Sequence, residues 1–564
     1  MDMNAQANIF SPDLNRRRFT PAPFPVRALA RPPVAPEPIV TLASLSARIA
    51  DRFIAETFSE ALHTQTGRSV LLISLEAGAA RFSLRDWDQT VVNGEFALAR
   101  HLEPVQYHVS RVRLHISGDP SEAAAITPLV RHCARHFQHV VIHASEVTPV
   151  PLLLECLAVS SRTFLLLQPA EEDLYHRNLL FREVRALPEA EHLNLRTIIC
   201  REKGEEHFNE LLKQMGASVH GFLHGCPPAS AAHSLRYWYD KNFNADIRRL
   251  AREVGHCRVG LALSSGGARG LAHIGVIQVF EEHGIDVDVV VGCSMGSYIG
   301  AVWAYGYDGV QMEKLAREFE HRWGLFELID PFILPRQGFL RGEKVKRRLK
   351  RSIGDVHFSE LVRPLRIVAT NLLTLERIVF SSGEVAAAVH ASSAIPGACV
   401  PVKLGDELYI DGGIADPLPV DVLEEMGIER IIAVNTIPTP AYLRCRVERD
   451  RERMAQRGAR PRKLRQSLNH YLNYFAPGNI LDTILRSFNG AQMRVAEESC
   501  LHADVVLRPL SFDGRWHDFR HPGKYIAIGR REAEERLEEV KALINRKEPI
   551  HETNTVDHAM AGLA

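Results

Sequence analysis

The sequence predicts an α/β protein with two separate domains, each built on a mainly parallel sheet. Its 564 residues exceed what one hydrophobic core usually supports. Short aliphatic runs alternate with amphipathic stretches before about residue 235 and again from Arg258 to about Thr436. Such alternation indicates parallel strands that are connected by helices. With 46% hydrophobic and 24% charged residues, the composition is that of an ordinary globular protein.

Charge and cysteine usage exclude several classes of protein. Lysine plus arginine and aspartate plus glutamate each number 68, so the net charge of zero predicts no nucleic-acid partner. The nine cysteines contain no Cys-x-x-Cys pair, which favours a reducing compartment over a disulfide framework. The sequence shows no apolar run long enough to span a bilayer and no secretory signal at its start. We therefore expect a cytoplasmic protein, with peripheral membrane contact left open.

Composition and pattern divide the chain into six segments. The first is rich in proline and arginine, and repeated proline favours an extended, disordered arm. Its arginines also suggest a transit peptide, but the prolines oppose the amphipathic helix that such a peptide needs. The segments are 1–40, the arm; 41–235, a Rossmann-like α/β domain without a phosphate-binding loop; 236–257, a connecting helix; 258–436, the second α/β domain; 437–545, a basic insert and helices that complete it; and 546–564, a tail.

Four aliphatic runs predict buried strands in the first domain: Ser69–Ser74, Val140–His143, Thr163–Leu167 and Leu195–Cys200. A phosphate-binding loop is expected after the first strand, yet Leu75–Arg81 has no Gly-Lys-Ser/Thr to hold phosphates and Mg²⁺. In strand order this region resembles a P-loop ATPase of the MinD kind that has lost its nucleotide machinery. We therefore expect no cofactor.

A glycine turn opens the second domain. A strand, Val259–Ser264, leads into Ser265–Gly270, and a helical pattern follows from Leu271 to His283. Unpaired amides at a helix start favour a negative charge. The turn therefore fits a dinucleotide pyrophosphate or a transient oxyanion, and it also fits simple packing of a helix on a sheet.

The next strand ends in a candidate nucleophile. Asp286–Val291 is followed directly by Gly292-Cys293-Ser294-Met295-Gly296, and a helical pattern begins at Ser297. This strand-turn-helix context is the one that a nucleophile elbow requires. Gly292 and Gly296 lack side chains that would collide with the exposed serine. The segment thus favours the oxyanion interpretation of the preceding turn.

A candidate base follows about 120 residues later. The short strand Glu407–Asp411 ends in an aspartate that precedes Gly412 and Gly413. Sites in open parallel sheets lie beyond the carboxyl ends of the strands, so we expect Asp411 and Ser294 at that edge. A simple Asp-Gly turn is the alternative.

These three motifs, in this order, resemble the signature of patatin-like phospholipases. Supporting phrases are Leu271–Val276, Ala369–Leu372, Ser392–Gly397 and Pro401-Val402, and the similarity covers residues 258 to 436. The neuropathy-target-esterase branch is the most similar, because its members also carry an α/β region and a lead-in like Ile247–Ala251 before the catalytic domain. The resemblance implies a three-layer α/β/α catalytic domain.

The resemblance also implies a mechanism. Ser294 would attack an ester carbonyl and Asp411 would take its proton, without a histidine. Amides around Gly266, Gly267 and Arg269 would hold the oxyanion, and Gly270, Gly412 and Gly413 are the remaining motif glycines. The implied substrates are phospholipids or lysophospholipids. Acyl transfer and a catalytically weakened, lipid- or partner-binding scaffold remain alternatives.

One departure concerns Ser265, where the family usually has glycine. If the position requires a positive φ, a serine there is strained by about 1–2 kcal/mol. Activity would then be reduced or the substrate preference altered.

Histidines offer two further hypotheses. His273 and His390 are candidates for a base beside Ser294, although the motif places His273 on the oxyanion helix, where a packing role is expected. A second group gathers near residue 137 but lacks the spacing of a structural zinc site, so we expect no metal; its members are His132, Cys133, His136, His139 and His143.

A basic stretch follows the second domain. Arg444–Arg465 contains ten Lys/Arg against three Asp/Glu, and aromatic and apolar residues continue to Phe488. Residues 444–488 therefore suit an anionic membrane surface. A solvated loop followed by a core helix fits the same pattern, and both interpretations stay open.

Overall fold

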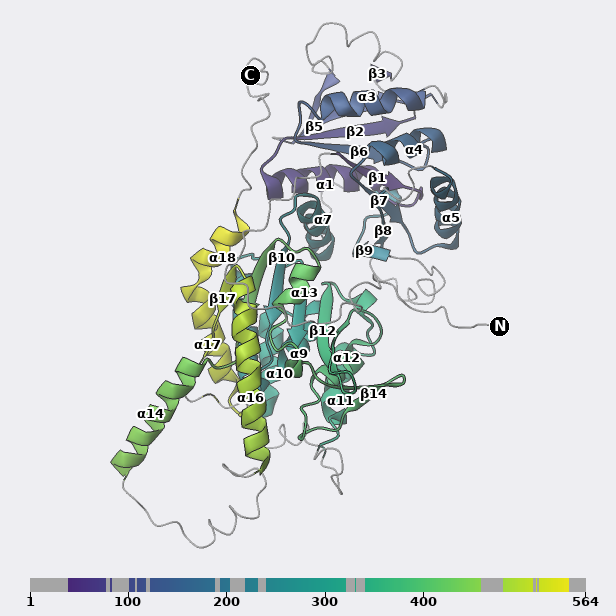
Figure 1. The fold of residues 1–564 in the computed structure, drawn as a ribbon. Coiled ribbons are helices and arrows are strands. Elements are labelled where there is room, and N and C mark those ends of the chain that lie inside the picture. Colours follow the sequence, from purple (N-terminus) through teal and green to yellow (C-terminus); the bar gives the residue numbers. More distant parts are fainter. Residues whose placement is uncertain are drawn as a thin grey trace. The chain divides into compact units, whose positions relative to one another are not determined.

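The fold is that of a computed structural model of the whole chain. The structure describes residues 39–77, 82–83, 101–106, 109–117, 122–187, 193–202, 219–231, 240–320, 330, 340–457, 480–510, 514 and 517–546. The predicted arm lies outside the described residues except for its last two positions, and of the predicted tail only Arg546 is described. The chain forms two compact units that divide between Cys257 and Arg258 (Figure 1).

Both units are α/β, so the predicted fold class is confirmed. In the first unit the strand order is β3-β5-β2-β6-β1-β7-β8-β9, and every pairing is parallel except that of β4 with β5. Its strands are β1 (Ile39–Ser44), β2 (Val70–Glu76), β3 (Phe82–Ser83), β4 (Glu103–Gln106), β5 (Val109–His115), β6 (His139–Ala144), β7 (Arg162–Leu167), β8 (Leu195–Cys200) and β9 (Val219–Leu223). Its longer helices are α1 (Asp51–Thr66), α3 (Ala123–Cys133), α4 (Val150–Val159), α5 (Glu171–Arg185) and α7 (Lys241–Val254).

The four predicted strands of this unit are all present, as β2, β6, β7 and β8. The sequence interpretation missed β1, which lies at the centre of the sheet between β6 and β7. The loop that follows the first strand is therefore residues 45–50, and it contains no glycine. The segment expected to connect the domains forms α7, which packs within this unit through Phe243 and Ile247.

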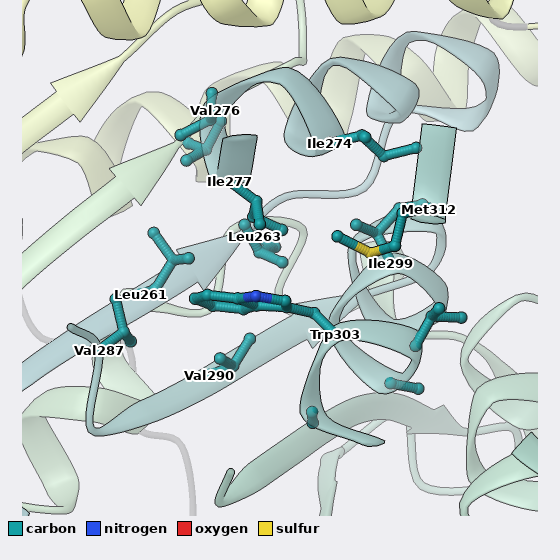
Figure 2. Close-up of a cluster of buried hydrophobic side chains, with 14 of the residues drawn as sticks. Leu261, Leu263, Ile274, Val276, Ile277, Val287, Val290, Ile299, Trp303 and Met312 are labelled. Carbon is teal, nitrogen blue, oxygen red and sulfur yellow. The ribbon is translucent and has the colours of Figure 1, made fainter. Parts of the chain in front are cut away.

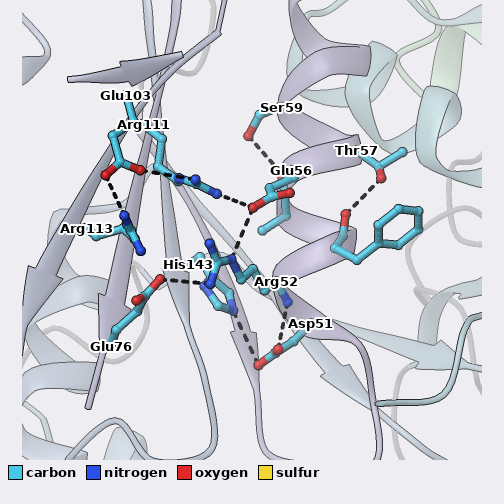
Figure 3. Close-up of polar contacts among 12 residues, drawn as sticks. Asp51, Arg52, Glu56, Thr57, Ser59, Glu76, Glu103, Arg111, Arg113 and His143 are labelled. Atoms are coloured by element: carbon cyan, nitrogen blue, oxygen red, sulfur yellow. Dashed lines mark hydrogen bonds and ion pairs between the residues drawn. The ribbon is translucent and has the colours of Figure 1, made fainter. Parts of the chain in front are cut away.

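A network of charged side chains joins α1 to the neighbouring strands (Figure 3). Arg111 of β5 pairs with Glu56 of α1 and, at 3.2 Å, with Glu103 of β4. Arg52 lies 3.1 Å from Glu56 and 3.5 Å from Glu76, the last residue of β2. Because these half-buried charges neutralise one another, they fix the first helix against the sheet.

The second unit contains an eight-stranded sheet of order β14-β15-β12-β11-β10-β16-β17, with β13 paired to β12. The strands are β10 (Val259–Leu263), β11 (Val289–Cys293), β12 (Leu365–Asn371), β13 (Arg377–Phe380), β14 (Val402–Leu404), β15 (Glu407–Asp411), β16 (Arg430–Val434) and β17 (Val505–Leu507). The longer helices are α8 (Ala272–Glu282), α9 (Met295–Tyr305), α10 (Gly309–Arg317), α11 (Glu343–Ile353), α12 (Val385–Ser392), α13 (Val420–Glu425), α14 (Pro440–Arg457), α16 (Ile480–Ser499), α17 (Pro522–Glu535) and α18 (Leu537–Ile544).

Helices cover both faces of this sheet. One core joins the sheet to α8, α9 and α17, and another joins it to α13 and the end of α16. Figure 2 shows the first core, in which the Trp303 ring of α9 lies over Val290 of β11 and beside Leu261 and Leu263 of β10. Trp303 is 2% exposed, and burial of such a ring contributes strongly to stability. The result is a three-layer α/β/α unit.

Two strands meet end to end along one edge of β12. Val368 pairs with Cys293 of β11 and also with β13, whereas the next residue, Ala369, pairs with Asp411 of β15 and also with β13. A strand has two edges, so β11 and β15 must share the edge opposite β13. Since β15 runs antiparallel to β12, it approaches β11 head-on.

This arrangement corrects part of the sequence argument. Asp411 was expected at the carboxyl edge of a parallel sheet, but β15 is antiparallel. Asp411 reaches Ser294 because β15 continues the line of β11 from the opposite direction.

The helices predicted to complete the second domain include α17 and α18 at its end. The first of these packs closely on α8, the helix that follows the glycine turn. A Cβ atom at Gly529 would collide with the carbonyl oxygen of Ala272, and one at Gly275 would collide with that of Ile526. Glycine at both positions lets the two backbones touch.

We predict that Gly529→Ala lowers the free energy of unfolding by about 1–3 kcal/mol, because the added methyl group forces α17 away from α8. Gly490→Ala is the matched control: Gly490 lies inside α16 with open space around it, and helix propensity predicts a gain of about 0.5–1 kcal/mol. Urea unfolding measures both. Equal stability of the two variants would contradict the close contact.

Candidate active site

Ser294 occupies a strained turn between β11 and α9. Its φ of 52° lies in the left-handed region, which side chains other than that of glycine rarely adopt. A Cβ atom at Gly292 would lie 2.5 Å from the Gly296 carbonyl oxygen, and one at Gly296 would collide with Leu263. Small residues on both sides therefore permit the sharp turn, and the serine side chain is presented at its apex.

The Ser294 hydroxyl contacts the candidate base directly. Its Oγ donates to Asp411 Oδ2 at 2.7 Å, and Asp411 Oδ1 accepts a 2.7 Å hydrogen bond from the Gly413 amide. Asp411 is 2% exposed. Both carboxylate oxygens are thus held, one by the serine and one by the glycine turn that follows the strand.

Burial changes the acid strength of Asp411. Desolvation raises the pKa of its carboxyl to about 6, although the hydrogen bonds from Ser294 and Gly413 oppose the shift. A carboxylate with a higher pKa is a stronger base. The site therefore holds an aspartate that is ionised at neutral pH and yet accepts a proton more readily than an exposed one.

Ser392, at the end of α12, fixes the backbone of the turn. Its Oγ accepts a 2.8 Å hydrogen bond from the Ser294 amide and donates at 2.6 Å to the Val368 carbonyl of β12. Asp411 is anchored by the same region, because its amide donates to the Ala394 carbonyl. Ser392 belongs to Ser392–Gly397, a stretch that resembles the family, but the sequence predicts no role for it because a serine in a helix carries no other signal.

The glycine turn forms a short 3₁₀ helix, Gly267–Leu271, directly after β10. In such a helix each amide donates to the carbonyl three residues back, which directs the Arg269 amide to the Gly266 carbonyl. The amides of Gly267 and Ala268 come earlier in the chain than the Arg269 amide, which makes the first bond of this helix. Gly267 has a φ of 57°, and a Cβ atom at Gly266 would collide with Thr436, so both positions favour glycine.

Ser265 is not strained. In the described part of the chain the non-glycine residues with positive φ are His256, Ser294 and Leu375. The expected cost of a serine at position 265 is therefore absent. Ser265 is 3% exposed, its amide donates to Pro417, and its Oγ has no hydrogen-bond partner among the described residues.

An apolar cavity of about 400 Å³ opens beside Ser294. Helix α9 supplies a stripe of lining residues, Met295, Tyr298, Ile299 and Val302, at helical spacing from the nucleophile. At ~1.5 Å per residue this stripe runs on the order of 12 Å along the helix. Gly267 lines the cavity too, so the first residue of the 3₁₀ helix and Ser294 border one space.

The two candidate histidine bases are engaged elsewhere. His273 donates from Nε2 to the Ser264 carbonyl at 3.0 Å, and burial lowers its pKa to about 4. His390 lies 3.3 Å from the Arg341 carbonyl through Nε2. In the second histidine group, the rings of His132 and His136 lie in tilted contact with each other, while His143 contacts Asp51. No group of three or more His, Cys, Asp or Glu residues in the described ranges is arranged to hold a metal ion.

The basic stretch is described only in part. Helix α14 presents Arg444, Arg449 and Arg451 to solvent, whereas residues 458–479 and the side chains at 480–486 lie outside the described part of the chain. Within the described ranges, no helix combines the length and apolarity needed to cross a membrane.

Residues 261–424 match the family model described as patatin-like phospholipase. An uncharacterized NTE family protein of Mycobacterium tuberculosis is 40% identical over 178 residues, which are 32% of this chain and 49% of that protein. The lysophospholipase nte1 of Aspergillus fumigatus is 35% identical over 231 residues, 41% of this chain and 15% of that protein. The chain thus spans half or less of the length of these curated relatives.

Two solved structures align with parts of this chain at low identity. A ParA family ATPase from Chlorobium tepidum aligns with 39% of this chain and 98% of its own, at 12% identity and a TM-score of 0.32. VipD from Legionella pneumophila aligns with 50% of this chain and 67% of its own, at 16% identity and a TM-score of 0.26.

We predict that Asp411→Asn stabilises the folded protein at neutral pH. The folded carboxyl has a pKa near 6 and the unfolded one near 4, so ionisation opposes folding as pH rises through this window. Asparagine removes that cost of about 2–3 kcal/mol and keeps an acceptor for the Gly413 amide. The stability difference between variant and wild type should grow by about 1 kcal/mol from pH 5 to pH 7 in urea unfolding. A difference independent of pH would mean that the carboxyl is not perturbed.

Proposed function

Because residues 261–424 match the family model of patatin-like phospholipases, we propose that the chain is a serine esterase that hydrolyses carboxylic esters of phospholipids or lysophospholipids. The observation that carries the proposal is the 2.7 Å hydrogen bond from Ser294 Oγ to a buried aspartate beside an apolar cavity. The relatives named lysophospholipase support the substrate class.

The reaction begins with attack of Ser294 Oγ on the ester carbonyl carbon. As the new C–O bond forms, the hydroxyl proton passes to Asp411 Oδ2, which already accepts it as a hydrogen bond. The tetrahedral intermediate collapses when the bond to the alcohol breaks. Asp411 returns its proton to the departing alcohol oxygen, which leaves an acyl group on the serine.

The glycine turn supplies the donors for the oxyanion. We assign the amides of Gly266 and Gly267, together with that of Ala268, to this role, because Gly267 faces the cavity beside Ser294. Arg269 supports the turn: its amide and its Nε, 3.4 Å away, are both directed at the Gly266 carbonyl. Each well-placed donor is worth ~3 kcal/mol of the barrier.

Water completes the cycle with the same groups. Asp411 takes a proton from the water that attacks the acyl carbonyl, and the collapse of the second intermediate returns this proton to Ser294. A histidine is not needed, because the raised pKa of Asp411 lets the carboxylate act as base and then as acid.

The cavity explains why a lipid ester suits the site. Its lining is mainly aliphatic and aromatic, and its volume falls in the range of small-ligand pockets, ~300–1,000 Å³. An acyl chain that follows α9 away from Ser294 would be removed from water over most of its length. We assign this cavity to the acyl chain of the substrate.

We further propose that residues 444–488 contact the membrane surface peripherally. Helix α14 begins shortly after the carboxyl end of β16, a strand parallel to β10 in the sheet that carries Ser294. Exposed arginines at this position suit anionic lipid head groups.

Substitution of either dyad residue should abolish hydrolysis. We expect Ser294→Ala and Asp411→Asn each to reduce fatty-acid release from lysophosphatidylcholine by about a thousandfold or more. Gly490→Ala, which lies in open space, should keep wild-type activity. A fluorophosphonate probe should label the wild type and not Ser294→Ala. Release at the wild-type rate by either dyad variant would refute the mechanism.

The pH profile should report the ionisation of Asp411. The charged carboxylate is the base, so we expect kcat/KM to fall about tenfold per pH unit below pH 6 and to level off above pH 7. Initial rates with a soluble ester between pH 4.5 and pH 8.5 measure this. A midpoint near pH 4 would show an aspartate that burial does not perturb.

A further inference from the structure

The turn between β12 and β13 holds two leucines in solvent. Leu373 is 73% exposed and Leu375 is 62% exposed, although most large apolar residues around this sheet are buried. An exposed leucine forgoes the stabilisation that burial would give. Single surface leucines are common, but two of them within one short turn form an apolar tip that suggests a partner.

The turn keeps its shape without the leucine side chains. Asn371 is 5% exposed, and its Oδ1 accepts hydrogen bonds from the amides of Leu373 at 2.8 Å and Thr374 at 3.1 Å. The Asn371 Nδ2 donates to Glu407 at 2.7 Å, and its carbonyl accepts from the Leu375 amide. These hydrogen bonds hold the tip in one conformation. The stretch Ala369–Leu372, which resembles the family, therefore has a structural role at the base of the tip.

Leu375 is strained as well as exposed. Its φ of 58° favours glycine or asparagine over leucine. In the described part of the chain, two other non-glycine residues have a positive φ: His256 follows α7, and Ser294 is the nucleophile. A leucine in this conformation, with its side chain in water, is an outlier that points to function.

The tip lies at the same end of the sheet as Ser294, where the parallel strands finish. Strands β11 and β12 are parallel, so their carboxyl ends share an edge. Asn371 lies three residues beyond Val368, which pairs with Cys293, so at ~3.3 Å per residue the base of the tip lies about 10 Å beyond Cys293 along the strand direction. By contrast, Leu501, 74% exposed, precedes β17 and lies at the opposite edge.

We propose that Leu373 and Leu375 anchor the protein in the apolar layer of its lipid substrate. This assignment rests on the proposed esterase function, since such an enzyme must reach esters held in a lipid surface, and it adds the means of reaching them. Glu376 and Glu407 beside the tip are acidic, and the neighbouring Arg377 pairs with Asp416 and Glu425, so attraction to anionic head groups is not the driving force of the anchor. The driving force is burial of the leucines among acyl chains. This anchor is therefore independent of the arginines of α14.

The double variant Leu373→Ser/Leu375→Asn tests the anchor. Asparagine suits the backbone at position 375, so the variant should fold at least as well as the wild type. We expect its binding to vesicles of phosphatidylcholine alone, measured by sedimentation, to weaken at least tenfold. Hydrolysis of micellar lysophosphatidylcholine should fall in parallel, while hydrolysis of a water-soluble short-chain ester stays at the wild-type rate.

Leu501→Ser is the matched control, because it removes an equally exposed leucine from the opposite edge; its vesicle binding should equal that of the wild type. Unchanged binding by the double variant, or equal weakening by Leu501→Ser, would overturn the anchor. A shift from dimer to monomer in the double variant would overturn it as well and assign the tip to a second copy of the chain. Failure of the esterase proposal appears separately, as absence of soluble-ester hydrolysis by the wild type, and vesicle binding tests the anchor in either case.

Discussion

The second unit depends on the place where two strands face each other along one edge of β12. There β11 delivers Ser294 from one direction and β15 delivers Asp411 from the other, and the hydroxyl meets the carboxylate at 2.7 Å. Register decides this contact, because pairings at Val368 and Ala369 set adjacent positions for the two strand ends. A shift of one residue in either strand would turn the side chains to the other face of the sheet.

Several features in and around this junction lower the stability of the folded protein. Ser294 adopts a positive φ, Asp411 is buried as a charge, and Ser265 carries a buried hydroxyl without a partner among the described residues. The surrounding structure offsets them: Ser392 ties the serine backbone to β12, and packing of α17 on α8 supports the glycine turn. Strain and buried charge at one point, supported by a well-packed frame, are typical of a site selected for reactivity.

Local sequence patterns predicted the parts of this site, and long-range pairing assembled them. Glycine turns and strand-turn-helix order identify Gly267, Ser294 and Asp411, because these signals depend on a few neighbouring residues. The antiparallel direction of β15 depends on its partner strand, and no pattern within Glu407–Asp411 encodes it. Strand β1 was missed since a six-residue run after a proline-rich segment carries little periodic signal. The role of Ser392 and the absence of strain at Ser265 likewise depend on contacts with distant residues.

The packing of α17 on α8 also determines when, during synthesis of the chain, the glycine turn gains its support. Helix α8 and the glycine turn are synthesised more than 240 residues before α17, and Gly529 must reach Ala272 before that turn is supported from behind. A ribosome-bound chain that already contains Ser294 and Asp411 would still lack this support. We therefore expect the glycine turn to gain its full support only after the last part of the unit emerges from the ribosome.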